Sequence, residues 1–367
     1  MDYVALPKIE LHAHFTGSIS RRVLHDIWLR KTAAGETDLD DPLVAMPEDK
    51  HDYNIETFFP LFGKYIYGLL TDEASIRQAM MSVLQDFLAD GVVYLELRTT
   101  PRATPTLSAE AYVRLLLDAM ADFEAAHGDA MHSRLILSVD RRHTLETAES
   151  IADLACRLYR QQSRRRPGGD GGDGGHHDER DDSGEAGAGV PGVVGLDLCG
   201  DPTVRPGGDI AFFTPVFDRA TRHGLGLTLH FAETRASASP EELRTLLAWR
   251  PRRLGHVICE DDEARAEIVR RRLCLELCLS CNVQADMVQG GFGQHHFKHW
   301  MDVDGPTISL GTDDVGVFGS PLSNEYRLVA EHFKLDRSRI CALARQGIDA
   351  IFGGDEEKQR LRDIMWS

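Results

Sequence analysis

The sequence predicts an α/β protein built as a (β/α)8 barrel, and three observations support this fold class. Eight short apolar runs alternate with segments of helical periodicity, a pattern typical of parallel βαβ units. Nearly continuous apolar runs suit strands that are covered on both faces of a sheet. No Gly-rich phosphate-binding turn follows the first run, which disfavours a doubly wound open sheet, the main alternative. We expect one domain over residues 1–367.

The predicted strands are short, and helical sequence follows each of them. The first begins at Ile9, includes His14 and leads into a Gly-bearing loop. The other seven are expected at Val92–Leu97, Arg134–Val139, Val193–Leu198, Leu225–His230, Arg253–His256, Leu273–Leu279 and Thr307–Leu310. In a closed barrel their C-terminal ends meet at one mouth, where the functional residues of this fold gather.

The predicted helices lie between these strands. The clearest is Glu73–Asp90, whose apolar residues recur at helical spacing and which Gly91 terminates. The others are expected at Ile19–Lys31, Ala109–Ala126, Thr147–Gln161, Phe212–His223, Pro240–Ala248, Asp261–Arg271, Asn324–His332 and Arg337–Ile351.

Two segments interrupt the alternation. Ile55–Leu70 is rich in aromatic side chains and suits a lid of short helices over a pocket, although an ordinary amphipathic core helix explains the pattern equally well. Gln162–Gly189 consists mainly of Gly, Asp, Arg and Ser. Such a segment buries too little apolar surface to offset the entropy of ordering, so we interpret it as a disordered insertion.

Composition restricts the partners and the compartment. The formal net charge of −17 argues against nucleic acid or an anionic membrane as a partner. No stretch approaches the roughly 20 apolar residues of a membrane span, and the N-terminus shows no secretory signal. Seven cysteines without framework spacing fit reduced thiols, so we expect a cytoplasmic protein.

Four polar residues at predicted strand ends form a candidate metal site. Because strand side chains alternate with period two, His12 and His14 point to the same side. His230 ends the fifth strand, and Asp313 follows the eighth, which neighbours the first in a closed barrel. Taken singly, His230 fits an ordinary core histidine and Asp313 a helix cap. Together, three imidazoles and one carboxylate form a plausible set of ligands for zinc.

Two more ionisable groups lie at the same rim. Glu233 is on the loop after the fifth strand and His256 ends the sixth, so either can act as an acid or base beside a metal-bound water. The segment Gln294–His299, which holds three histidines but no carboxylate, is a competing metal candidate. Cys278 and Cys281 lie in an apolar run, and we interpret them as strand and strand-end residues.

Five short groups of residues along the chain carry a resemblance to a known family. They are Leu6-Pro7-Lys8 with His12-x-His14, Leu196-Asp197-Leu198-x-Gly200-Asp201, His230-Phe231-Ala232-Glu233, Gly255-His256 and Thr312-Asp313-Asp314. Together they resemble the adenosine deaminase family of zinc-dependent (β/α)8 hydrolases. The resemblance covers essentially the whole chain except Gln162–Gly189. It excludes the zinc deaminases that carry His-x-Glu and Pro-Cys-x-x-Cys motifs.

The resemblance implies a role for each matching residue. The four candidate ligands would bind one zinc ion, and no lysine at the end of the fourth strand offers a bridge to a second metal. Glu233 would protonate purine N1 while C6 is attacked, and His256 and Asp313 would orient and deprotonate the attacking water. The backbone N–H of Gly200 would donate to N3, and Asp314 would accept a hydrogen bond at N7. A monomer is the default for this family.

Thr16 indicates a nucleotide substrate. Family members that act on adenosine usually carry Asp at this position, two residues after the second metal histidine, where it meets the ribose 5′ hydroxyl. A carboxylate there would repel a 5′-phosphate, whereas a hydroxyl can donate to it. The chain thus looks like the adenosine-deaminase-like branch, which converts N6-methyl-AMP to IMP and methylamine. In that branch His14, Asp140 and lid residues near Tyr67 would also contact the substrate.

Two other functions remain as alternatives. The first is deamination of adenosine or adenine, which an assay with and without the 5′-phosphate separates from the nucleotide activity. The second is a catalytically silent metal-binding barrel. The presence of Glu233 and His256 disfavours it, because loss of either would be expected of a silent protein.

Overall fold

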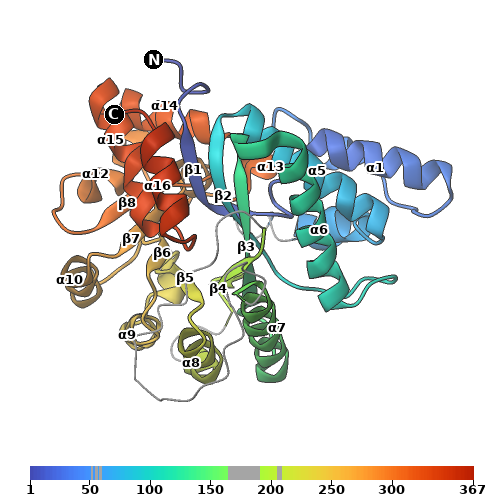
Figure 1. Cartoon of the computed structure of the whole chain (residues 1–367), viewed down its shortest axis with the longest axis horizontal. Coiled ribbons are helices and arrows are strands. Elements are labelled where there is room, and N and C mark those ends of the chain that lie inside the picture. The colour runs from blue at the N-terminus through green and yellow to red at the C-terminus, as the bar shows by residue number, and fades with distance from the viewer. Residues whose placement is uncertain (51–52, 54–56, 58–59, 164–190, 205–208) are drawn as a thin grey trace, which may run out of the picture.

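The sheet at the centre of the molecule contains eight parallel strands in the order β1 to β8 (Figure 1). The computed structural model describes the whole chain except residues 51–52, 54–56, 58–59, 164–190 and 205–208. The strands are β1 (Lys8–His14), β2 (Val92–Thr99), β3 (His132–Asp140), β4 (Val193–Cys199), β5 (Gly226–Phe231), β6 (Arg253–His256), β7 (Cys274–Leu277) and β8 (Thr307–Leu310). All eight predicted strands are therefore present.

The sheet closes between its first and last strands. Ala13 forms a parallel bridge with Asp313 just beyond β8. The His14 amide donates to the Asp313 carbonyl oxygen (2.9 Å), and the Asp313 amide donates to the His12 carbonyl oxygen (2.7 Å). This seam completes the predicted (β/α)8 barrel and brings the two ends of the sheet together at the mouth.

Helices surround the strands (Figure 1). They are α1 (Arg21–Ala33), α2 (Pro42–Ala45), α4 (Tyr67–Leu69), α5 (Glu73–Ala89), α6 (Ala109–His127), α7 (Leu145–Ser163), α8 (Thr214–Arg222), α9 (Pro240–Ala248), α10 (Asp262–Arg271), α11 (Leu279–Gln284), α12 (Phe297–Trp300), α13 (Val315–Phe318), α14 (Leu322–Phe333), α15 (Arg337–Gln346) and α16 (Asp355–Ile364). Polar caps begin several of them, such as Asp72 at α5 and Ser108 at α6, whose side chains accept from backbone amides of the first turn. No helix in the described part of the chain is long and apolar enough to cross a membrane.

The C-terminal region differs from the prediction. The helix expected at Arg337–Ile351 ends at Gln346, and a 3-10 turn (Gly347–Ala350) follows it. Helix α16 was not predicted, because its sequence is mostly charged and only Glu357 and Leu361 of it are buried. Such a narrow buried stripe gives little helical periodicity. Strand β7 is also shorter than expected, since a helical turn begins at Leu279.

The two irregular segments are described only in part. Within the predicted lid, Phe62–Ile66 forms a π-helical turn and α4 follows it, so the described residues are helical as expected. Other residues of that lid, Phe58 and Phe59 among them, lie outside the described residues. Helix α7 extends through Ser163, so the first two residues of the predicted insertion are helical. The rest of that insertion also lies outside the described residues.

The barrel interior contains buried charged side chains beneath the mouth. Glu276 accepts hydrogen bonds from Arg98 (2.8 Å) and from Arg253 (2.5 Å), and Arg253 also donates to Glu96 (2.6 Å). All four side chains are fully buried. Charges at such depth are tolerated only when they are paired and hydrogen-bonded. This network of buried charges lies beneath the residues at the mouth and supports them.

Candidate metal centre and active site

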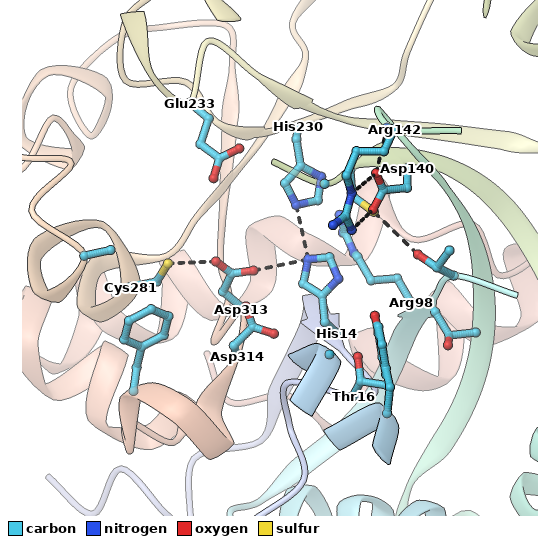
Figure 2. Close-up of a pocket in the computed structure, with 18 of the residues that line it drawn as sticks. His14, Thr16, Arg98, Asp140, Arg142, His230, Glu233, Cys281, Asp313 and Asp314 are labelled. Atoms are coloured by element: carbon cyan, nitrogen blue, oxygen red, sulfur yellow. Dashed lines mark hydrogen bonds and ion pairs between the residues drawn. The ribbon is translucent and has the colours of Figure 1, made fainter. Parts of the chain in front are cut away.

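The four predicted metal ligands converge at the mouth of the barrel. Figure 2 shows three of them, His14, His230 and Asp313. Their ligand atoms all lie within 4.8 Å of one another. His14 Nε2 is 3.1 Å from His230 Nε2, and Asp313 Oδ1 is 3.3 Å from His14 Nε2 and 3.4 Å from His12 Nε2. Strand β1 supplies two of these residues, β5 supplies one and the seam after β8 supplies the fourth. The predicted set of residues is thus brought together.

Hydrogen bonds on the far side of two rings fix which nitrogen faces the centre. His12 Nδ1 donates to Glu276 Oε2 (2.7 Å), and His230 Nδ1 donates to the Leu198 carbonyl oxygen (2.9 Å). In their neutral forms both rings therefore present a lone pair on Nε2. Such outer hydrogen bonds are typical of metal-ligating histidines, because they orient the ring and fix its tautomer.

The charges at this centre favour the binding of a cation. Burial lowers the pKa of His14 to about 4, so this ring is neutral at pH 7. Burial and Arg98 lower the pKa of His12, but the carboxylates of Asp313 and Glu276 outweigh them and bring it to about 9. A ring with this pKa is protonated at pH 7 in the metal-free protein, so binding of a metal to His12 must release a proton. Three imidazole nitrogens and a carboxylate in this arrangement fit a divalent metal.

Glu233 approaches the same centre from the loop after β5 (Figure 2). It is 8% exposed, and its Oε2 has no hydrogen-bond partner in the described part of the chain. Burial raises the pKa of Glu233 to about 7. His256 ends β6, and its Nε2 lies 3.9 Å from Glu233 Oε1 and 4.0 Å from Asp313 Oδ2. A carboxyl group that keeps its proton near neutral pH is suited to act as a general acid.

Asp314 lies beside the metal centre but is not part of it. Its Oδ1 is buried and finds no hydrogen-bond partner among the residues that the structure describes. Burial, together with the charges of Asp313 and Glu233, raises the pKa of Asp314 well above its usual range. Gly17 makes room for this carboxyl group, because a Cβ on Gly17 would overlap it. The loop after β1 therefore requires glycine at this position.

A cavity of about 260 Å³ opens above these groups. All six residues predicted to contact a substrate line it, namely His14, Thr16, Tyr67, Asp140, Gly200 and Asp314. Gly200 has φ +98°, a conformation that favours glycine, and a Cβ there would lie 2.6 Å from Asp140. Its backbone can therefore approach a ligand closely. Tyr67 reaches the cavity from α4, in the described part of the predicted lid.

Sequence reasoning assigned no functional role to two other residues of the cavity. Arg142 donates to both carboxylate oxygens of Asp140, through Nε (2.8 Å) and Nη2 (2.6 Å). The Cys281 thiol donates to Asp313 Oδ2 (2.8 Å) (Figure 2). Both follow strand ends closely in sequence, which was the available signal.

The interpretation of the cysteine pair needs correction. Cys278 lies just beyond the end of β7 and directly precedes α11, and Cys281 lies within that helix. The prediction was wrong because the chain becomes helical directly after β7. Cys278 approaches His256 and Asp313 closely enough for a three-residue metal group, but the competing segment Gln294–His299 contributes to no such group in the described part of the chain.

Comparison with known proteins identifies the family of the chain. The family model for adenosine deaminase matches residues 7–163 and 190–366. The chain belongs to the adenosine deaminase family. This confirms the resemblance seen in the sequence, and the chain is a purine aminohydrolase of a metal-dependent family.

Particular adenosine deaminase relatives are similar over nearly their full length. An N6-mAMP deaminase of Arabidopsis thaliana is 33% identical, with 99% of this chain and 98% of the relative covered. An N6-methyl-AMP deaminase of Danio rerio is also 33% identical, with 98% and 94% covered. The crystal structure of Arabidopsis ADAL complexed with IMP matches with a TM-score of 0.81 at 31% identity and covers 99% of this chain and 97% of that one.

Proposed function

We propose that the protein hydrolyses N6-methyl-AMP to IMP and methylamine. The observation that carries the proposal is the cluster of four candidate metal ligands beside a cavity that Glu233 and Thr16 line. The relatives at 33% identity are named for this activity, and the matching Arabidopsis structure holds IMP. A hydroxyl at Thr16 suits a 5′-phosphate, which the carboxylate of an aspartate would repel.

Three residues would hold the purine. Glu233 keeps a proton near neutral pH and would place it on N1, which makes C6 electrophilic. The Gly200 amide would donate to N3. Asp314 would bond to N7, which carries a lone pair. The raised pKa of Asp314 therefore supports a protonated carboxyl group that donates to N7, the reverse of the direction expected from the sequence.

Four residues would hold one zinc ion: His12, His14, His230 and Asp313. Nitrogen and carboxylate ligands of this kind suit zinc among the available divalent metals. When bound, the metal supplies a water whose pKa is lowered to about 7. His256 Nε2 and Asp313 Oδ2 lie 4.0 Å apart at the mouth, and both would orient the attacking water toward C6.

The remaining cavity residues would recognise ribose and phosphate. Asp140 ends β3 and would accept from a sugar hydroxyl, while Arg142 offsets its charge. Thr16 and Tyr67 lie on segments after β1 and would contact the phosphate side of the nucleotide. We propose that the protein acts as a cytoplasmic monomer with no nucleic acid or membrane partner.

The test is a turnover assay on N6-methyl-AMP, AMP, N6-methyladenosine and adenosine with the zinc-loaded protein. We expect fast conversion of N6-methyl-AMP and little of adenosine. The variant Thr16→Asp should lower kcat/KM for N6-methyl-AMP and leave that for N6-methyladenosine nearly unchanged. Conversion of adenosine and of AMP at equal rates would identify an ordinary nucleoside deaminase. Metal analysis should return one equivalent of zinc per chain, and two equivalents at the mouth would contradict the proposed site.

A further inference from the structure

His256 is supported from behind by buried hydrogen bonds that begin at a backbone amide. The Phe297 amide donates to His295 Nδ1 (3.0 Å), and His295 Nε2 lies 3.1 Å from Asn282 Oδ1. Asn282 Nδ2 in turn lies 2.9 Å from His256 Nδ1. All three side chains are fully buried. They come from the end of β6, from α11 and from the segment before α12, so this relay connects three separate parts of the mouth.

The direction of each hydrogen bond follows from the first one. A backbone amide can only donate, so His295 Nδ1 accepts and the proton of the neutral ring lies on Nε2. That proton must meet the amide oxygen of Asn282, which turns the Asn282 NH2 group toward His256. His256 Nδ1 therefore accepts as well. In its neutral form His256 carries its proton on Nε2.

The hydrogen bonds keep both rings neutral, because a ring nitrogen that accepts from an N–H group carries no proton of its own. His256 Nε2 faces the mouth between Glu233 and Asp313 and has no hydrogen-bond partner among the described residues. An oxygen atom that enters this space meets an N–H group and not a lone pair.

His296 adds a second support, at the backbone of His256. Its Nε2 donates to the His256 carbonyl oxygen (2.6 Å), and its ring stacks on that of His295 with centroids 4.1 Å apart. His256 has φ +66°, which is unfavourable for a residue with a side chain and needs support from its surroundings. The two adjacent histidines, which sequence reasoning considered as metal ligands, thus both act on His256.

We propose that Asn282 and His295 are positioning residues that hold His256 as its Nε2–H tautomer. His256 then donates a hydrogen bond to the attacking water and does not take its proton. As the water oxygen bonds to C6, the proton that it loses passes to a carboxylate, Asp313. This revises the expectation that His256 and Asp313 share the deprotonation. The catalytic part of the proposal rests on the proposed function, whereas the tautomer does not.

The decisive variant is Asn282→Asp, which replaces the NH2 group by an oxygen of similar size. A carboxylate accepts from His256 Nδ1 and cannot donate to it, so we expect the proton of the neutral ring on Nδ1 and a lone pair on Nε2. We expect kcat to fall by about 10²- to 10⁴-fold, the usual contribution of a positioned acid–base group. KM should change little, because Asn282 does not line the cavity.

Nitrogen NMR of the metal-loaded protein, labelled with ¹⁵N-histidine, reads the tautomer directly. His256→Gln identifies the His256 signals by their loss. We expect a protonated Nε2 in the wild type and a protonated Nδ1 in Asn282→Asp. His127 is an internal reference, because its Nδ1 donates to the Phe123 carbonyl oxygen (2.8 Å) and so carries the proton.

A second pair of variants keeps the test decisive if Asn282→Asp does not fold. His295→Leu removes the donor to Asn282 and should lower kcat by about tenfold, the value of one buried hydrogen bond. His295→Gln retains a donor and should restore most of that loss. His299→Leu, at an exposed position of the same segment, should leave kcat unchanged.

Two results would overturn the proposal: a bare Nε2 on His256 in the wild type, or wild-type kcat and tautomer in Asn282→Asp. A wild-type protein that converts none of the four purines but shows the Nε2–H tautomer would instead refute the proposed function. The relay itself would stand in that case.

Discussion

Replacing Glu233 by Gln should stabilise the metal-free protein and abolish most of its activity. Burial raises the pKa of Glu233 from 4.5 to about 7. The folded protein therefore holds this proton more tightly than the unfolded chain does. The stability that the group contributes is complete below pH 4.5 and is lost as the pH rises toward 7. A shift of roughly 2.5 units at about 1.4 kcal/mol per unit amounts to about 3 kcal/mol at pH 8.

Glutamine is uncharged at every pH, so Glu233→Gln avoids this loss. Denaturant unfolding of metal-free protein should show equal stability near pH 4.5 and a gain for the variant that reaches about 3 kcal/mol above pH 7. Its kcat in the zinc-loaded form should fall about 10²- to 10⁴-fold. Glu356→Gln, at an exposed position, is the control and should show no such gain. A stability difference that does not vary between pH 5 and pH 8 would refute the reasoning.

Three further perturbations test the geometry of the mouth. Gly17→Ala should displace Asp314 by steric overlap. We expect the unfolding free energy to fall by about 1–3 kcal/mol and kcat/KM to fall as well. Unchanged kinetics would contradict the tight fit between Gly17 and Asp314. Cys281→Ala should weaken metal binding about 10- to 100-fold in a chelator competition, because it removes the hydrogen bond to Asp313, and Cys281→Ser should recover most of this loss. Metal removal should lower the melting temperature, since a ligand at 100 times its Kd stabilises the folded state by about 2.7 kcal/mol. It should also speed hydrogen exchange at the His14 amide, and equal exchange with and without metal would show that the seam does not depend on the ion.

The cluster of four candidate metal ligands could be predicted from the sequence because local rules place its members. Period two puts His12 and His14 on one side of a strand, and the parallel barrel puts His230 and Asp313 at the same mouth. Glu233 followed from its short distance in sequence from His230. Each of these inferences needed only one strand and the fold class.

The supporting residues could not be predicted in this way. Asn282 and His295 act on His256 through side-chain contacts between segments that are far apart in the sequence, and no periodicity marks such contacts. The raised pKa of Asp314 depends on burial and on neighbouring charges, which appear only when the chain is folded. Helix α16 could not be predicted because its buried stripe is too narrow to give a helical periodicity.

The seam at Ala13 and Asp313 has a consequence for the order of events during synthesis. His12 and His14 leave the ribosome long before Asp313, which lies on the far side of the seam. On a nascent chain one edge of β1 therefore remains unpaired. Only three of the four candidate ligands are present until β8 and Asp313 have been synthesised. The four candidate ligands can therefore come together only after Asp313 has been synthesised.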